Sequence, residues 1–145
     1  MEFNHPFSVP KPLDEVWQTM TNLEKVIPCV PNATVVEASG PKSAKAQIKM
    51  RLGSMSMTYT GPAEIVNQDD GSHHAVMTAK AQEAGGQGNA DARVEISLSA
   101  DGGSTKGTLK STINVTGKAA QMGEGTIEGV TNSLIEGFAS NLAKI

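Results

Sequence analysis

The sequence contains few aromatic residues: three Phe, one Trp and one Tyr make up 3% of its 145 residues. Aromatic side chains normally fill much of a protein core, because each of them buries about 150–250 Å². The interior must therefore be built from aliphatic side chains and from the seven methionines. A domain made of such small and flexible side chains either packs very closely or encloses space.

Cysteine, net charge and long apolar runs are scarce as well. The single cysteine, Cys29, excludes an internal disulfide and a cysteine-based metal site. The 12 Lys and Arg against 15 Asp and Glu give no basic excess that would predict nucleic-acid binding. No apolar run approaches the roughly 18 residues of a membrane span, and the N-terminus lacks a basic-then-apolar signal. We therefore expect a soluble, cytoplasmic protein.

Hydrophobic periodicity predicts one α+β domain over residues 1–145. A strand is expected over residues 2–9, followed by two short helices. In the first helix Leu13, Val16, Trp17 and Met20 recur at helical spacing, and the second begins with Asn22 as N-cap. From residue 33 to residue 115 the period is two, with turns near 53–54, 69–71, 85–88 and 101–103, which predicts a long antiparallel meander and a sheet of about seven strands.

After Gly117 the period changes to that of a helix, which we expect from about residue 123 to the end of the chain. Its apolar stripe consists of Ile127, Val130, Leu134, Phe138, Leu142 and Ile145. A helix with a single apolar stripe must cover a single surface, so this one is expected to lie against the concave face of a curved sheet.

The residues that usually carry catalysis are isolated in this sequence. Neighbouring residues of a strand point to opposite faces, so His73 and His74 form a poor metal pair and are expected at the solvated surface. Cys29 has no histidine nearby to activate it and is expected to be a small buried hydrophobe. The glycine-rich stretch 85–88 precedes a strand pattern and not a helix, which favours a hairpin or bulge over a phosphate loop. The carboxylates lie on outward strand positions, so neither a metal site nor catalysis is indicated.

The remaining candidate for function is the interior space. Small side chains on the inward parity of the meander leave volume beneath a covering helix, and methionines would give that volume an adaptable apolar wall. By themselves the residues leave two possibilities open, a cavity or a helix that sits closer and fills the gap. The small inward residues are Ala44, Ala46, Ala63, Ala79, Ala81, Ala90, Ala92 and Gly107, and the methionines are Met50, Met55, Met57 and Met77.

Several local motifs, in this order of elements, resemble the G-subunit family of carbon monoxide dehydrogenase, within the START-like and polyketide-cyclase-like (SRPBCC) superfamily. The motifs are FSVP at 7–10 with EVW at 15–17, CVPNA at 29–33, GQGNA at 86–90 and GKAAQMG at 117–123. The family has glycine where Asn32 stands, and Asn tolerates the left-handed backbone that a glycine would supply. The resemblance spans nearly the whole chain and implies the helix-grip fold, in which a curved antiparallel sheet wraps around a long C-terminal helix and leaves a ligand cavity.

The resemblance also implies a bacterial, non-enzymatic accessory protein. Such proteins are linked to molybdenum carbon monoxide dehydrogenases or related hydroxylases and to the inner face of the cell membrane. Electrons from carbon monoxide oxidation must reach a respiratory quinone such as menaquinone, so we expect a lipophilic ligand, a quinone or another lipid, and no covalent cofactor. Membrane contact is expected through a tail that family members carry after this domain and that this sequence does not contain.

Two other functions stay open at this point. One is a recruitment or docking module for the dehydrogenase that carries no ligand, and the other is a cyclase-type enzyme acting on a small molecule. We expect Trp17 or Tyr59 to donate a hydrogen bond to a quinone oxygen. The residues expected to line the cavity are Trp17, Ile27, Met57, Tyr59, Met77, Val94, Ile96, Ile113, Val130, Leu134 and Phe138.

Overall fold

A computed structural model of the chain describes residues 1–144. The predicted sequence of elements is confirmed: one strand, two short helices, an antiparallel meander and a C-terminal helix. The elements are β1 Glu2–Val9, α1 Leu13–Met20, α2 Leu23–Val26, the 3₁₀ helix η1 Ile27–Cys29, β2 Ala33–Ala38, β3 Ser43–Leu52, β4 Met55–Asp69, β5 His74–Glu83, β6 Asn89–Asp101, β7 Ser104–Val115, the 3₁₀ helix η2 Ala119–Met122 and α3 Glu124–Leu142.

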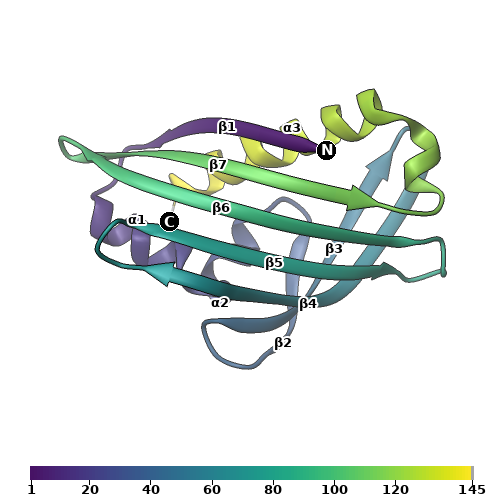
Figure 1. Ribbon diagram of the computed structural model, residues 1–145, viewed down its shortest axis with the longest axis horizontal. Helices are drawn as coiled ribbons and strands as arrows, with labels where there is room; N and C mark the ends of the chain where they lie inside the picture. Colours follow the sequence, from purple (N-terminus) through teal and green to yellow (C-terminus); the bar gives the residue numbers. More distant parts are fainter. Residues whose placement is uncertain (145) are drawn as a thin grey trace.

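The seven strands form one curved antiparallel sheet in the order β1-β7-β6-β5-β4-β3-β2. Figure 1 shows α3 on the inner side of the sheet, while α1 and α2 lie at one end of it. The fold is therefore the α+β helix-grip arrangement that the periodicity and the family resemblance predict. Its inner face is the surface on which any ligand site between sheet and helix must lie.

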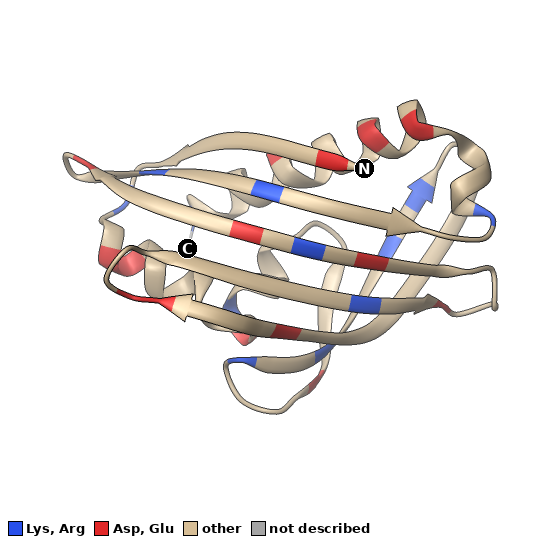
Figure 2. Cartoon of the chain, in the orientation of Figure 1, with Lys and Arg blue, Asp and Glu red and all other residues tan. Residues whose placement is uncertain are grey.

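The outer face of the sheet is polar and carries both signs of charge, as Figure 2 shows on β4 to β7. On β6 the inward side chains alternate with Asp91, Arg93 and Glu95. The Arg93 guanidinium donates to Glu95 Oε1 at 2.9 Å and lowers the pKa of that carboxyl. Water weakens ion pairs at such solvated positions, so the outer face keeps the sheet in water and adds little stability.

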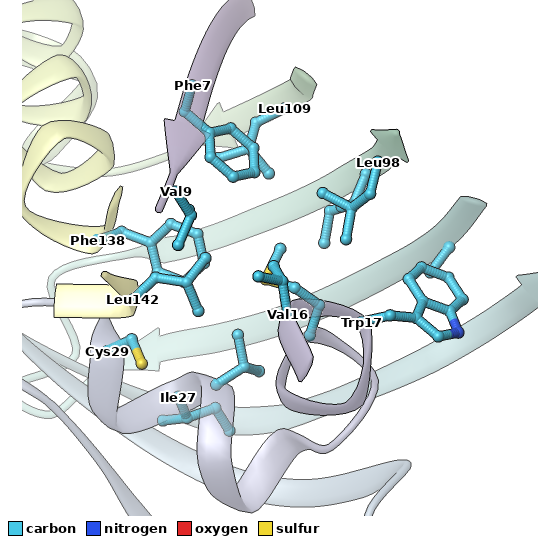
Figure 3. Packing of buried hydrophobic residues seen from close by; sticks show 14 of the residues in the cluster. Phe7, Val9, Val16, Trp17, Ile27, Cys29, Leu98, Leu109, Phe138 and Leu142 are labelled. Atoms are coloured by element: carbon cyan, nitrogen blue, oxygen red, sulfur yellow. The ribbon is translucent and has the colours of Figure 1, made fainter. Parts of the chain in front are cut away.

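One end of the molecule is closed by α1, which buries Val16, Trp17 and Met20 as the helical spacing predicts (Figure 3). The indole Nε1 of Trp17 donates to Asp70 Oδ1 at 2.9 Å, and its ring meets that of His73 edge-on at 5.3 Å. Trp17 thus connects α1 to the β4–β5 turn. His73 and His74 are both half-buried, so each keeps part of the solvent exposure that the sequence predicts.

Two Asn residues support the entry into the sheet. Asn22 caps α2, with its Oδ1 accepting the Glu24 N–H, as predicted. Asn32 has φ of 64°, which is the left-handed conformation expected where the family has glycine. This turn places Pro31 against α3, where a Cβ on Gly137 would come within 2.5 Å of Pro31 Cγ.

The glycine-rich stretch 85–88 connects β5 to β6, as predicted, and is not followed by a helix. It packs against the start of the segment that leads to α3: the Lys118 N–H donates to Gln87 O at 2.9 Å. A Cβ at Gly88 would come within 2.0 Å of Thr116 O, and one at Gly117 equally close to Gln87 O. Two of the family motifs therefore meet here, and the close backbone approach accounts for their glycines.

The apolar stripe of α3 differs from the predicted one. Val130 and Leu134 are half-buried, whereas Thr131 and Ile135 are buried, and Ile145 lies outside the described residues. Positions three and four apart share one helix face. In the middle of α3 the buried positions are therefore 131 and 135, each one residue after the predicted positions 130 and 134. The threonine among these positions conceals the buried row in the sequence. The buried residues of α3 are Ile127, Thr131, Ile135, Phe138 and Leu142.

Candidate functional site

A row of alanines crosses the inner face of the sheet. The strand register aligns, on β3, β4, β5 and β6 in turn, Ala44, Ala63, Ala79 and Ala92. Ala44 is buried, but the other three are half-buried although they face inward at the middle of the sheet. Their side chains end at Cβ and do not reach the helix opposite, so space remains between the two layers.

This space is an apolar pocket of about 280 Å³. Its floor is the inner face of β4 to β7, its roof is α3, and one side is formed by α2, η1 and Val30. Thr78 points outward, between inward Met77 and Ala79, and borders the pocket with its backbone. The bordering residues are Leu23, Val26, Ile27, Val30, Ala63, Met77, Thr78, Ala79, Ala92, Val94, Ile96, Leu109, Ser111, Ile113, Thr131, Leu134, Ile135 and Phe138.

Seven of the eleven residues expected to line a cavity border this pocket. They come from three parts of the chain: η1, the strands β5 to β7, and α3. Figure 3 shows two of them, Ile27 and Phe138, within the buried cluster at the end of the sheet that α1 covers. The seven are Ile27, Met77, Val94, Ile96, Ile113, Leu134 and Phe138. Their contact with a ligand stays a prediction.

The other four expected residues lie elsewhere. Trp17 belongs to the contact with the β4–β5 turn, while Met57 and Tyr59 belong to a second buried cluster with Leu52 and Ala119, against which Val130 packs. The alanine row separates this second cluster from the one beneath α1. Strand parity correctly predicts that Met57 and Tyr59 face inward, but it does not say how far along the sheet they lie from the pocket.

Neither aromatic residue expected to donate a hydrogen bond to a ligand reaches the pocket. Trp17 Nε1 is already bonded to Asp70, and the Tyr59 hydroxyl, on a side chain only 1% exposed, donates to Met57 Sδ at 3.7 Å. Burial, and secondarily the charge of Glu83, raises the pKa of Tyr59. Both expectations of a donor are therefore corrected.

Several residues of the pocket were not among the expected ones. Leu109 and Ser111 share the strand parity of Ile113 on β7, so the same pattern could have indicated them. Leu23 and Val26 are apolar members of a short helix whose placement depends on tertiary packing. Thr131 had no apolar signal at all, because its side chain is polar.

A separate surface groove lies beside the pocket and shares Leu134 with it. This half-buried side chain borders both spaces. The groove runs between α3 on one side and, on the other, residues 31–32 before β2 and the end of β3, past Gly125, Gly129 and Met50. A Cβ at either glycine would meet no atom within 4 Å, so the missing side chains leave this groove open. Leu134 is therefore the side chain that lies between the interior pocket and the surface groove.

The pocket's side chains carry no charge. Its polar side chains are the hydroxyls of Ser111 and Thr131, and no titratable residue borders it. Among residues 1–144 no group of three or more His, Cys, Asp and Glu could hold a metal ion. The arrangement can enclose a neutral apolar molecule, and it offers that molecule hydrogen bonds from hydroxyl groups.

The buried titratable groups serve the fold. Glu83 is 9% exposed, which corrects the expectation that the carboxylates all lie outward. It accepts the Thr58 N–H at 3.1 Å and the Gly85 N–H at 2.6 Å, and these bonds, that of Thr58 first, lower the pKa of its carboxyl. Burial raises the pKa of the Cys29 thiol, which donates to Lys25 O at 3.5 Å. Cys29 is thus the small buried residue that the sequence predicts.

Comparison with protein families identifies this chain over almost its full length. The sequence profile of CoxG, the G subunit of carbon monoxide dehydrogenase, matches residues 6–145. Comparison with curated proteins gives no match. None of the helices described in residues 1–144 is long and apolar enough to cross a membrane.

Solved structures share the fold at low sequence identity. A conserved protein from Geobacillus kaustophilus has a TM-score of 0.86 at 20% identity, covering 99% of this chain and 93% of its own. The Zhui aromatase/cyclase from Streptomyces sp. R1128 has a TM-score of 0.69 at 11% identity, covering 99% and 92%. Norcoclaurine synthase from Thalictrum flavum has a TM-score of 0.66 at 12% identity, covering 99% and 84%. At these identities the likeness concerns the fold alone.

Proposed function

The chain belongs to the CoxG family of carbon monoxide dehydrogenase, and from this premise we propose that it is a non-enzymatic accessory protein whose pocket binds a lipophilic molecule, a respiratory quinone. In this role it links a molybdenum carbon monoxide dehydrogenase to the cytoplasmic membrane by carrying the quinone between them. The observation that supports the proposal is the uncharged pocket of about 280 Å³ between the sheet and α3.

The expected affinity suits a carrier that must release its ligand. A bicyclic quinone head has an area comparable to that of a large aromatic side chain, about 150–250 Å². At about 25 cal/mol per Å², its transfer from water would contribute about 4–6 kcal/mol. This corresponds to a Kd on the order of 0.04–1 mM for the head alone, before any contribution from hydrogen bonds or from the tail.

The volume limits what is carried inside. Since a water molecule occupies about 30 Å³ of liquid volume, a pocket of about 280 Å³ corresponds to roughly nine waters. It would hold a quinone head and the first part of a tail, but not a long isoprenoid chain. We infer that the rest of the tail passes Leu134 and lies in the groove beside Gly125 and Gly129.

The cyclase-type alternative has less support, although an aromatase/cyclase and a synthase share the fold. General acid–base catalysis needs a titratable group within reach of the substrate. The residues that border the pocket supply hydroxyls and apolar groups, so they offer no candidate for this role. The docking-module alternative differs from our proposal only in having no bound ligand, and the experiment below separates the two.

The test is to extract the purified protein with organic solvent and to identify bound lipids by mass spectrometry. We expect a quinone from the parent protein and much less from Met77→Trp, because the indole would occupy the pocket. Met55→Trp is the matched control, since Met55 packs against the second cluster and not against the pocket. Carriage would be refuted, and docking favoured, if the purified parent protein yields no quinone and, after delipidation, takes up no short-chain quinone.

A further inference from the structure

Two hydroxyl groups that border the apolar pocket form no hydrogen bond with any of residues 1–144. Ser111 on β7 is 4% exposed and Thr131 on α3 is 8% exposed, and both border the pocket. They come from opposite walls, one from the sheet and the other from the helix. A buried hydroxyl without a partner costs free energy, so two of them in one apolar space require a physical explanation.

Within residues 1–144 neither hydroxyl is hydrogen-bonded to its neighbours. The cross-strand neighbours of Ser111 are Phe3 and Val94, which carry no polar side-chain atom. A helical threonine commonly donates to the carbonyl four residues earlier, as Thr19 does to Glu15 O at 3.3 Å. Thr131 makes no such bond in the described part of the chain.

Both oxygens remain open to the pocket. Within residues 1–144, Gln68 Oε1 is the one buried side-chain oxygen or nitrogen that has almost no accessible surface and also lacks a hydrogen-bond partner. The hydroxyls of Ser111 and Thr131 have no partner either, so they must keep some accessible surface. Both border the pocket, and the accessible surface is therefore available to a molecule inside it.

We propose that Ser111 and Thr131 bind the oxygen-bearing end of the ligand, which enters the pocket head first with its tail toward Leu134. The proposal rests on the function proposed above and specifies the ligand class: a neutral, mainly apolar molecule that carries a carbonyl oxygen. Each hydroxyl donates its proton to that oxygen. A fatty acid is excluded as the inner ligand, because its carboxylate would lose hydration without meeting a positive charge.

The experiment compares two probes of similar shape, menadione, which has two carbonyl oxygens, and 2-methylnaphthalene, which has none. Their Kd values are measured by equilibrium dialysis with delipidated parent protein and with Ser111→Ala, Thr131→Val and the double variant. A neutral hydrogen bond changes a Kd by roughly 2- to 13-fold. We expect each single variant to weaken menadione binding by a factor in this range and to leave 2-methylnaphthalene binding unchanged or tighter.

Thr78→Val is the matched control, because it removes a hydroxyl from a residue whose side chain points away from the pocket, and it should change neither Kd. A double variant that keeps the parent's affinity for menadione would overturn the proposal, and so would an equal loss for both probes. If the parent protein binds neither probe, the proposed carriage itself fails. Urea unfolding gives an independent check: both variants should be at least as stable as the parent, since an unpartnered buried hydroxyl is removed.

Discussion

The clearest test of the pocket is to fill it from the sheet by replacing Ala79 with leucine. Ala79 is half-buried at the centre of the alanine row, with Ala63 and Ala92 on either side. Leucine adds three carbon atoms, each contributing about 0.8 kcal/mol when it is buried without strain. Subtracting about 0.5–1 kcal/mol for lost rotamer freedom, we expect a stabilisation of about 1.5–2 kcal/mol.

The same substitution at Ala75 provides the control. Ala75 lies on the same strand and the same face as Ala79, but it is 0% exposed within the main buried cluster. Extra carbon atoms in a filled core force side chains and backbone to shift, which costs about 1–3 kcal/mol. The two variants should therefore change the free energy of unfolding in opposite directions and differ by about 2.5–5 kcal/mol.

Urea unfolding of delipidated protein measures this difference, because a bound ligand would itself stabilise the folded state. For a chain of this size Ala79→Leu should raise Tm by about 3–8 °C. It should also weaken menadione binding, since three water-sized groups of about 30 Å³ each would occupy about a third of the pocket. Destabilisation by Ala79→Leu as large as that by Ala75→Leu would refute our interpretation of the space as a pocket.

Two further predictions concern the roof of the pocket and the β5–β6 end of the sheet. Gly129→Ala should stabilise α3 by about 0.5–1 kcal/mol, because the added Cβ meets open space. Gly137→Ala should destabilise the protein by about 1–3 kcal/mol, because the added Cβ would collide with Pro31. Equal effects of the two variants in chemical denaturation would contradict the close approach of α3 to Pro31. The pKa of Glu83 is lowered in the folded protein, so the unfolded chain binds more protons in the acidic range. The carboxylate therefore contributes to stability above its ordinary pKa, and this contribution disappears as the pH falls through the pKa of the folded state. Glu83→Gln should therefore reduce both the stability at neutral pH and its decline in acid, and a variant whose urea midpoint keeps the parent's pH profile would show that Glu83 does not contribute in this way.

Periodicity in the sequence was sufficient to predict the elements and the face on which each side chain lies. Alternation placed Met77, Val94 and Ile113 on the inner face, and helical spacing placed Phe138 on the buried face of α3. These predictions succeed because the direction of a side chain depends on backbone geometry that repeats every 2 or 3.6 residues. The left-handed Asn32 was predictable for a similar reason, since few residues tolerate that conformation.

Position along the sheet could not be predicted in this way. Met57 and Tyr59 face inward as expected, yet they lie in a separate cluster on the other side of the alanine row. The alternation of a strand repeats identically from one end to the other, so it carries no information about which inward residue lies beneath which part of α3. That relation is set by the crossing of helix and sheet, which involves residues far apart in the chain.

The pocket itself was decided by the tertiary structure. Ala63, Ala79 and Ala92 are separate small residues in the sequence, and only the pairing of β4, β5 and β6 aligns them into one row. A shift of that pairing by a single residue would turn one strand's alanine to the outer face and close the space. Thr131 likewise acquires its place from the rotation of α3 against the sheet. Local sequence specifies the face of each element, whereas an enclosed space depends on how several elements pack together.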